Sequence, residues 1–285
     1  MHEGREGNLE RESASGPRRV VSLQPSVTLT LARLGTLDRL AACTRYCRDV
    51  CPEAAEGGRR IVQDSWSATA EEILAAKPDL VIASVPYRAE ALAEILKAGV
   101  PFLALAPHSL DDVFADIALI AGAMQVPERG TALIAEMRRE IAEAGQRARR
   151  AVLRPRVFCE EWGKPVIHSQ RWVKELVEIA GGEFVGEPGK QAPADAVRDA
   201  DPEVMIFAWC GAGDRVPLEK VIRERRWDET SAARTGRVFC LRDELLNTPG
   251  PSLVDGLRAL AWCVHPEIFA APESGVRGLK ALVIK

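Results

Sequence analysis

The chain has 285 residues, 47% of them hydrophobic and 28% charged, so it can bury a large core, and its length favours two compact lobes over one. A net charge of −3 excludes a basic surface for nucleic acid, and no stretch approaches the roughly 18 consecutive apolar residues that span a bilayer. Seven scattered cysteines, an odd number, are not the pattern of a disulfide framework and are expected as free thiols.

The first residues are polar. Residues 1–19 contain no apolar segment of the kind that a secretory signal requires, so the chain as written is expected to be cytoplasmic. A truncated or misannotated N-terminus would give the same pattern in a periplasmic or extracellular protein. We expect residues 1–17 to form a disordered leader.

Strands and helices alternate after this leader. Apolar strands are predicted at 19–23, 79–84 and 101–105, and helices at 25–34, 69–77, 88–99 and 110–123. In the second half, strands are predicted at 156–161, 203–209 and 236–241, and helices at 171–182 and 252–265. Such alternation indicates βαβ crossovers and a mainly parallel sheet.

One long helix separates the two halves. Residues 127–150 begin with Pro127, which a helix start tolerates, and carry apolar residues at helical spacing mostly in the first half. The segments "AAKPDLVIAS" and "DADPEVMIFA" repeat the same pattern in each half. We therefore expect an α/β protein of two Rossmann-like lobes, 18–125 and 152–270, joined by a bridging helix at 126–151 and followed by a tail at 271–285.

The motifs of this framework resemble one known family. They are "VVSLQPSVT" (20–28), "EEILAAKPDLVIAS" (71–84), "RVFCEEWGKPV" (156–166), "WVKELVEIAGGEF" (172–184) and "TPGPSLVDGLRALAWCVHPEIF" (248–269). Together they are similar to substrate-binding proteins of ABC importers in the cobalamin and iron-siderophore class, over residues 18–270, and "EEWGKP" is most similar to the cobalamin-binding branch. The resemblance implies a ligand in the cleft between the lobes and docking to an ABC permease dimer through one carboxylate per lobe, Glu71 and Asp195.

A corrinoid or porphyrin is a broad, flat, partly apolar disc, so its site should offer aromatic faces. Four aromatic residues fall at predicted strand exits or in loops: Trp66, Tyr87, Trp162 and Trp209. The alternative for each is an ordinary core or rim aromatic. Trp172, Trp227 and Trp262 lie within or beside helical patterns and are expected in the core.

The stretch "CTRYCRDVCP" (43–52) holds three cysteines, fewer than the four ligands of a usual structural zinc site, and we expect a strand running into a loop. The family resemblance picks out Tyr46 and Cys47 as a cleft-facing pair, with Cys43 in a buried strand. A cytoplasmic metal or iron–sulfur protein using Cys43, Cys47 and Cys51 is the alternative from another class.

Two further residues are candidates for ligand contact. His168 follows a strand and precedes a helix, so it is either an axial metal ligand or a loop or capping histidine. Cobalamin binders carry an arginine where this chain has "NTPGPS" (247–252), and Arg242 is the residue that could replace it.

No motif indicates catalysis. "GAGDRV" (211–216) lacks the third glycine of a dinucleotide fingerprint and is expected to be a turn, and Glu160 and Glu161 are expected to be a rim pair. The sequence thus predicts a monomeric, non-catalytic binding protein that needs no cofactor. Its expected ligand is cobalamin or another corrinoid, haem or a ferric siderophore. A cytoplasmic sensor or storage module on the same fold stays open.

Overall fold

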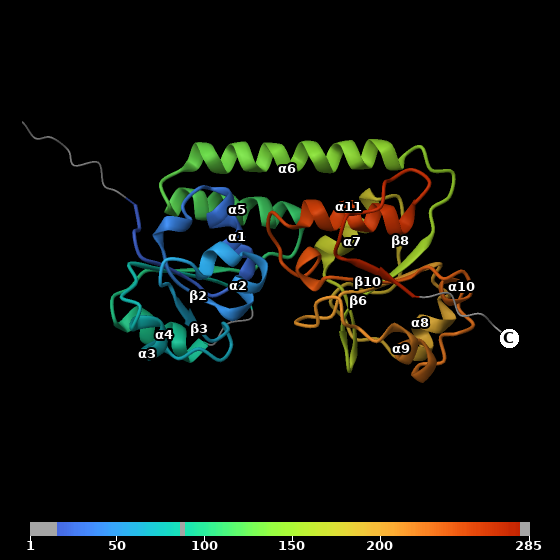
Figure 1. Cartoon of the computed structure of the whole chain (residues 1–285), viewed down its shortest axis with the longest axis horizontal. Coiled ribbons are helices and arrows are strands. Elements are labelled where there is room, and N and C mark those ends of the chain that lie inside the picture. The colour runs from blue at the N-terminus through green and yellow to red at the C-terminus, as the bar shows by residue number, and fades with distance from the viewer. Residues whose placement is uncertain (1–15, 86–88, 280–285) are drawn as a thin grey trace, which may run out of the picture.

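The computed structural model describes residues 16–85 and 89–279 as two α/β lobes lying side by side beneath one long helix (Figure 1). The N-terminal lobe contains five strands: β1 (Val20–Ser22), β2 (Leu40–Thr44), β3 (Arg60–Val62), β4 (Leu80–Ser84) and β5 (Phe102–Leu105). Its helices are α1 (Pro25–Arg33), α2 (Arg45–Val50), α3 (Ala70–Leu74), α4 (Ala89–Lys97) and α5 (Leu110–Ala123), with short 3-10 turns η1 (Leu37–Arg39) and η2 (Pro52–Ala55).

These five strands form one parallel sheet in the order β3-β2-β1-β4-β5. The order reverses next to β1, because the chain first builds outward through β2 and β3 and then crosses to β4 and β5. In sheets of this kind, ligands bind outside the carboxyl ends of the strands near the point of reversal. The segments after β1, β2 and β4 are therefore the part of this lobe to inspect for a site.

The C-terminal lobe holds a mixed sheet in the order β11-β10-β9-β6-β7, with β8 pairing β6. Its strands are β6 (Arg156–Gly163), β7 (Val166–His168), β8 (Glu183–Phe184), β9 (Val204–Phe207), β10 (Val238–Leu241) and β11 (Val276–Gly278). Its helices are α7 (Arg171–Ile179), α8 (Ala194–Asp199), α9 (Leu218–Glu224), α10 (Ser231–Arg234) and α11 (Leu253–Val264), with the 3-10 turn η3 (Asp243–Leu245). The pairs β6–β7 and β10–β11 are antiparallel, and the others are parallel.

Buried side chains alternate between the two faces of each sheet, as strand geometry requires. In β9, Val204 and Ile206 face one core, whereas Met205 and Phe207 face another. The first of these cores is continuous through both lobes, because it includes residues of α1, α5, α6, α7 and α11 as well as strands of each sheet. The lobes therefore share a hydrophobic core beneath the long helix, in addition to the covalent connection.

That long helix is α6 (Pro127–Ala148), which runs along both lobes (Figure 1). It has Pro127 in its first turn and Arg147 in its last, both favourable places for these residue types. Leu133 and Met137 point into the shared core. Within the described part of the chain, no helix combines the length and the apolarity needed to cross a bilayer.

The predicted fold class is confirmed: two α/β lobes with mainly parallel strands and a bridging helix. The loop expected after Cys43 is wrong in part, because residues 45–50 form α2. Strands β3, β7, β8 and β11 were not predicted; each has two or three residues and little apolar pattern. The last of them lies in the segment expected to be a tail.

Candidate functional site

The carboxyl ends of the parallel strands in the two lobes face each other. Tyr46 follows β2, and its Cε1 atom lies 3.9 Å from where a Cβ on Gly211, in the turn after β9, would be. Ser26, at the start of α1 after β1, has its Cβ and its carbonyl oxygen 3.3 Å from where a Cβ on Gly250 would be. We call the segments that follow β1, β2 and β3 in one lobe and β6, β9 and β10 in the other the inter-lobe site.

Two aromatic residues form the N-terminal wall of the inter-lobe site. The rings of Tyr46, in the first turn of α2, and Trp66, after β3, have centroids 6.0 Å apart and are tilted by 31°. Trp66 is 50% exposed, which leaves much of its indole face open. Arg45 donates a hydrogen bond of 2.8 Å to the Tyr46 hydroxyl and lies over its ring. This wall offers the apolar faces that a flat ligand needs.

A buried ion pair fixes an aromatic residue of the opposite wall. Trp209 follows β9 and donates from Nε1 to Glu160 Oε1 at 3.1 Å. The other Glu160 oxygen accepts from Arg225, the residue after α9, at 2.6 Å, and Arg225 also donates to the Gly163 carbonyl. Burial raises the pKa of the Glu160 carboxyl, and the Arg225 and Trp209 hydrogen bonds act against that rise. Glu160 is thus an interior anchor for Trp209, which corrects its expected place on the rim.

The Trp209 ring also lies directly on the backbone of Gly163. A Cβ at Gly163 would lie 2.4 Å from the ring, so Gly163→Ala must move the indole. We expect this variant to lose about 1–3 kcal/mol of stability through overpacking and to show shifted Trp fluorescence. Gly122→Ala is the matched control, because a Cβ there meets nothing within 4 Å. An unchanged emission spectrum in Gly163→Ala would contradict the described position of Trp209.

Glu161, expected to be a rim residue, lies at the same end of β6 as Glu160 but on the other face of the sheet. Its Oε1 accepts a 2.6 Å hydrogen bond from Gln170, the residue before α7. Desolvation raises the pKa of Glu161 to about 7. Cys210 lies near it, and Asn247 Nδ2 is 3.4 Å from the Cys210 Sγ. A half-buried carboxylate next to a ligand site is a candidate functional group.

The raised pKa of Glu161 gives a pH-dependent stability. The folded state binds the Glu161 proton more tightly than the unfolded chain does, so protonation of Glu161 stabilises the fold. This stabilisation is complete at low pH and is lost as the pH rises through about 7. Relative to Glu161→Gln, we expect wild-type stability to fall between pH 5 and pH 8 by about 2–3 kcal/mol at most. Urea unfolding of both proteins across this range measures the difference. Burial also raises the pKa of Asp116 to about 6. Asp116 titrates in both proteins, so its effect on stability cancels in the comparison.

The three neighbouring cysteines do not form a ligand-facing cluster. Cys47 is fully buried on the inner side of α2, where Thr44 caps the helix by accepting the Cys47 N–H. Its Sγ lies 3.2 Å from the Thr44 hydroxyl. The expected contact of Cys47 with a ligand is therefore contradicted, because the helical turn directs Tyr46 outward and Cys47 inward. The hydrogen bond with Cys47, together with burial, raises the pKa of Cys43.

His168 is likewise in the interior. It is 4% exposed, its Nδ1 lies 3.1 Å from the Lys190 carbonyl, and its ring packs edge-on against Phe158. This position contradicts the expected role as an axial ligand. Across residues 16–85 and 89–279, no group of three or more His, Cys, Asp or Glu side chains is placed to hold a metal ion.

Two further predicted residues, Trp162 and Arg242, lie at the ends of strands of the C-terminal lobe. Trp162 is 46% exposed at the β6–β7 turn, with its Nε1 bonded to the Lys164 carbonyl. Arg242 follows β10 and pairs with Glu244. Tyr87 lies outside the described residues. The expected turn at "GAGDRV" is confirmed, since Gly211 and Gly213 have positive φ and both donate their N–H to Asp243.

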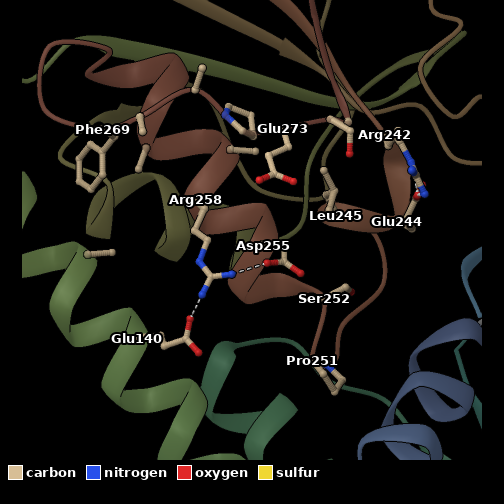
Figure 2. Close-up of a pocket in the computed structure, with 18 of the residues that line it drawn as sticks. Glu140, Arg242, Glu244, Leu245, Pro251, Ser252, Asp255, Arg258, Phe269 and Glu273 are labelled. Atoms are coloured by element: carbon tan, nitrogen blue, oxygen red, sulfur yellow. Dashed lines mark hydrogen bonds and ion pairs between the residues drawn. The ribbon is translucent and has the colours of Figure 1, made fainter.

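A separate cavity of about 870 Å³ lies where α1, α6, α11, η3 and residues 269–275 meet (Figure 2), and it shares Val50 and Leu245 with the segments that follow β2 and β10. Of the predicted ligand-binding residues that the structure describes, Arg242 alone lines it. Its charges are largely paired within it: Arg258 bonds both Asp255 and Glu140, and Arg242 bonds Glu244 (Figure 2). Among its described lining residues the cavity has Phe269 but no facing pair of aromatic residues. It is less suited to a flat apolar ligand than the inter-lobe site.

Comparison with known proteins places this architecture in a family. Residues 20–245 match the family described as "Periplasmic binding protein". The chain belongs to this family. The match spans both lobes and the bridging helix, and it confirms the resemblance inferred from the sequence motifs.

Individual family members agree with this assignment. The "Uncharacterized ABC transporter substrate-binding lipoprotein YvrC" of Bacillus subtilis (strain 168) is 23% identical, over 89% of this chain and 82% of its own length. The "Vitamin B12-binding protein" of Pectobacterium atrosepticum is 27% identical, over 70% of this chain and 74% of its own. The structure of the "Periplasmic heme-binding protein RhuT" from Roseiflexus sp. RS-1 superposes with a TM-score of 0.78 at 26% identity, covering 88% and 99% of the two chains. These names give no support to the expected cytoplasmic location.

The two predicted docking carboxylates occupy similar places in this family fold. Glu71 lies in the first turn of α3 and Asp195 in the first turn of α8, one in each lobe, and both are exposed. Figure 1 shows α3 and α8 on the side of the molecule away from α6. Asp195 forms an ion pair with Arg198 of the same helix at 2.8 Å. Their role in docking stays a prediction.

Proposed function

We propose that the protein is a non-catalytic solute-binding protein that holds a corrinoid, or a related metal chelate such as haem or a ferric siderophore, in the inter-lobe site. One observation carries the proposal: aromatic residues from both lobes, the Tyr46–Trp66 pair and the anchored Trp209, stand at strand ends that face each other. Aromatic faces on opposite walls suit a broad, flat, partly apolar ligand. Relatives named for vitamin B12 and haem binding support the same ligand class.

The ligand is then delivered to an ABC importer outside the cytoplasm. This part of the proposal is supported by the family and by a relative named as a transporter substrate-binding lipoprotein. Glu71 and Asp195 are the proposed contacts with the permease dimer, because an exposed carboxylate in each lobe lets one protein engage both halves of a two-fold partner. Burial of the three neighbouring thiols and the absence of a metal-ligand group among the described residues disfavour the metal-protein alternative.

Equilibrium binding tests the proposal. Purified protein is titrated with cyanocobalamin, dicyanocobinamide, haemin and a ferric siderophore, and the absorbance of the chelate is followed. We expect saturable one-to-one binding of at least one of them with Kd at or below about 1 μM, which corresponds to roughly 8 kcal/mol. Failure of all four to bind would overturn the proposed ligand class.

A further inference from the structure

Glu161 is a carboxylate of the inter-lobe site with spare hydrogen-bonding capacity. One oxygen accepts from Gln170, and among residues 16–85 and 89–279 no ion pair of Glu161 is found. Its neighbour Glu160 contacts the opposite face of the sheet, where Arg225 neutralises it. The carboxylate that remains beside the site therefore lacks a protein cation.

The charged and titratable groups around Glu161 are already engaged or are acidic. Burial raises the pKa of Cys210, after β9, and the nearby Glu161 charge raises it further. Asp243 of η3 accepts hydrogen bonds from the amides of Gly211 and Gly213. Three cations of the surrounding segments are also engaged: Arg45 donates to Tyr46, Arg215 donates to the Gly211 carbonyl, and Arg242 pairs with Glu244. From α7, Glu161 receives the neutral amide of Gln170.

The edge of a flat chelate can carry amides or carboxylates, and a protein carboxylate without a cation interacts differently with each. It accepts hydrogen bonds from amide N–H groups, and such charge-assisted bonds are stronger than neutral ones. It repels a ligand carboxylate, and the repulsion is large where the carboxylate is partly desolvated. A wall that carries Glu161 therefore discriminates between ligands that share one ring and differ only in their edges.

We propose that Glu161 accepts a hydrogen bond from an N–H group of the bound ligand, and so makes the inter-lobe site select a ligand rimmed by amides over the same ligand rimmed by carboxylates. The inference rests on the proposed function, since it requires a chelate in this site. It names the ligand edge that this lobe contacts and assigns Glu161 as the residue that determines specificity.

A matched pair of corrinoids tests the inference. Dicyanocobinamide carries amide side chains, and dicyanocobyrinic acid carries carboxylates on the same ring. At pH 8 we expect wild-type protein to prefer the amide form, and Glu161→Gln to reduce the ratio of the two Kd values roughly tenfold, because a neutral amide neither repels carboxylates nor makes charge-assisted bonds. Glu219→Gln, an exposed change on α9 of the same lobe, should leave the ratio unchanged.

The wild-type protein provides an independent readout if Glu161→Gln does not fold. Lowering the pH from 8 to 6 should reduce the preference for the amide form, because Glu161 becomes protonated. A ratio that is the same in wild type and Glu161→Gln, or that does not change with pH, overturns the role of Glu161 while the proposed function stands. Absence of binding by both corrinoids overturns the role of Glu161, and failure of haemin and the ferric siderophore to bind as well overturns the proposed function.

Discussion

Glu160→Gln is expected to lower the free energy of unfolding by about 3–5 kcal/mol, because it leaves the guanidinium of Arg225 buried without its counter-charge. The two side chains are 0% and 12% exposed, and their atoms are 2.6 Å apart. The substitution keeps the shape of the side chain and an acceptor for Trp209, so the loss reports the charge. Urea unfolding monitored by circular dichroism measures it.

A double-mutant cycle separates the ion pair from its surroundings. Glu160→Leu with Arg225→Met should be much less destabilising than the sum of the two single changes, because two buried apolar side chains need no counter-charge. Lys220→Ala on α9 is the control: its ion pair with Glu224 is exposed and should contribute no more than about 0.5 kcal/mol. Additive single effects, or losses below about 1 kcal/mol, would contradict the anchoring role of this pair.

Trp66→Ala is expected to weaken binding of the chelate identified by titration roughly 10- to 100-fold, while unfolding changes by less than about 0.5 kcal/mol. The difference arises because Trp66 is half exposed in the free protein and packs mainly against Tyr46, so its apolar face becomes buried only when a ligand covers it. Isothermal titration calorimetry and urea unfolding on the same preparations give both quantities.

Leu119→Ala provides the comparison for Trp66→Ala. Leu119 is 53% exposed on α5, away from the inter-lobe site, so its removal takes away a similar kind of exposed apolar surface. Its Kd should equal that of wild type. Equal affinity of Trp66→Ala and Leu119→Ala would show that the Tyr46–Trp66 wall does not contact the ligand.

The fold was predictable because its main elements have strong local signals. Continuous apolar strands such as Leu80–Ser84 and the long periodic helix Pro127–Ala148 are visible as sequence patterns, and their alternation allows few topologies. Short edge strands carry no such signal: β3 has the burial of a solvent-facing strand, and β8 has two residues. The position of these short strands is set by their pairing with neighbouring strands, which depends on contacts between residues distant in sequence.

The candidate site was predictable only in part. Trp209 follows β9, as the βαβ alternation predicts, and Trp66 lies in the loop before α3, as expected. Tyr46 was indicated by the family resemblance. The direction of a side chain was not predictable at Cys47, because one residue of offset on α2 separates an outward from an inward position. Thr44 followed by residues that form a short helix was the available signal, since threonine is a preferred N-cap. The Glu160–Arg225 pair joins residues 65 apart, so no local pattern could reveal it.

Amide hydrogen exchange, measured with and without the best-bound chelate, tests most directly whether the ligand sits between the lobes. Protection is expected in segments of both lobes together, residues 44–47 and 63–67 on one wall and 208–214 on the other, none of which lines the separate cavity. The backbone around Glu140 and Arg258, which lines the separate cavity, should exchange as in the free protein. Protection confined to one lobe, or centred on α6 and α11, would contradict binding in the inter-lobe site.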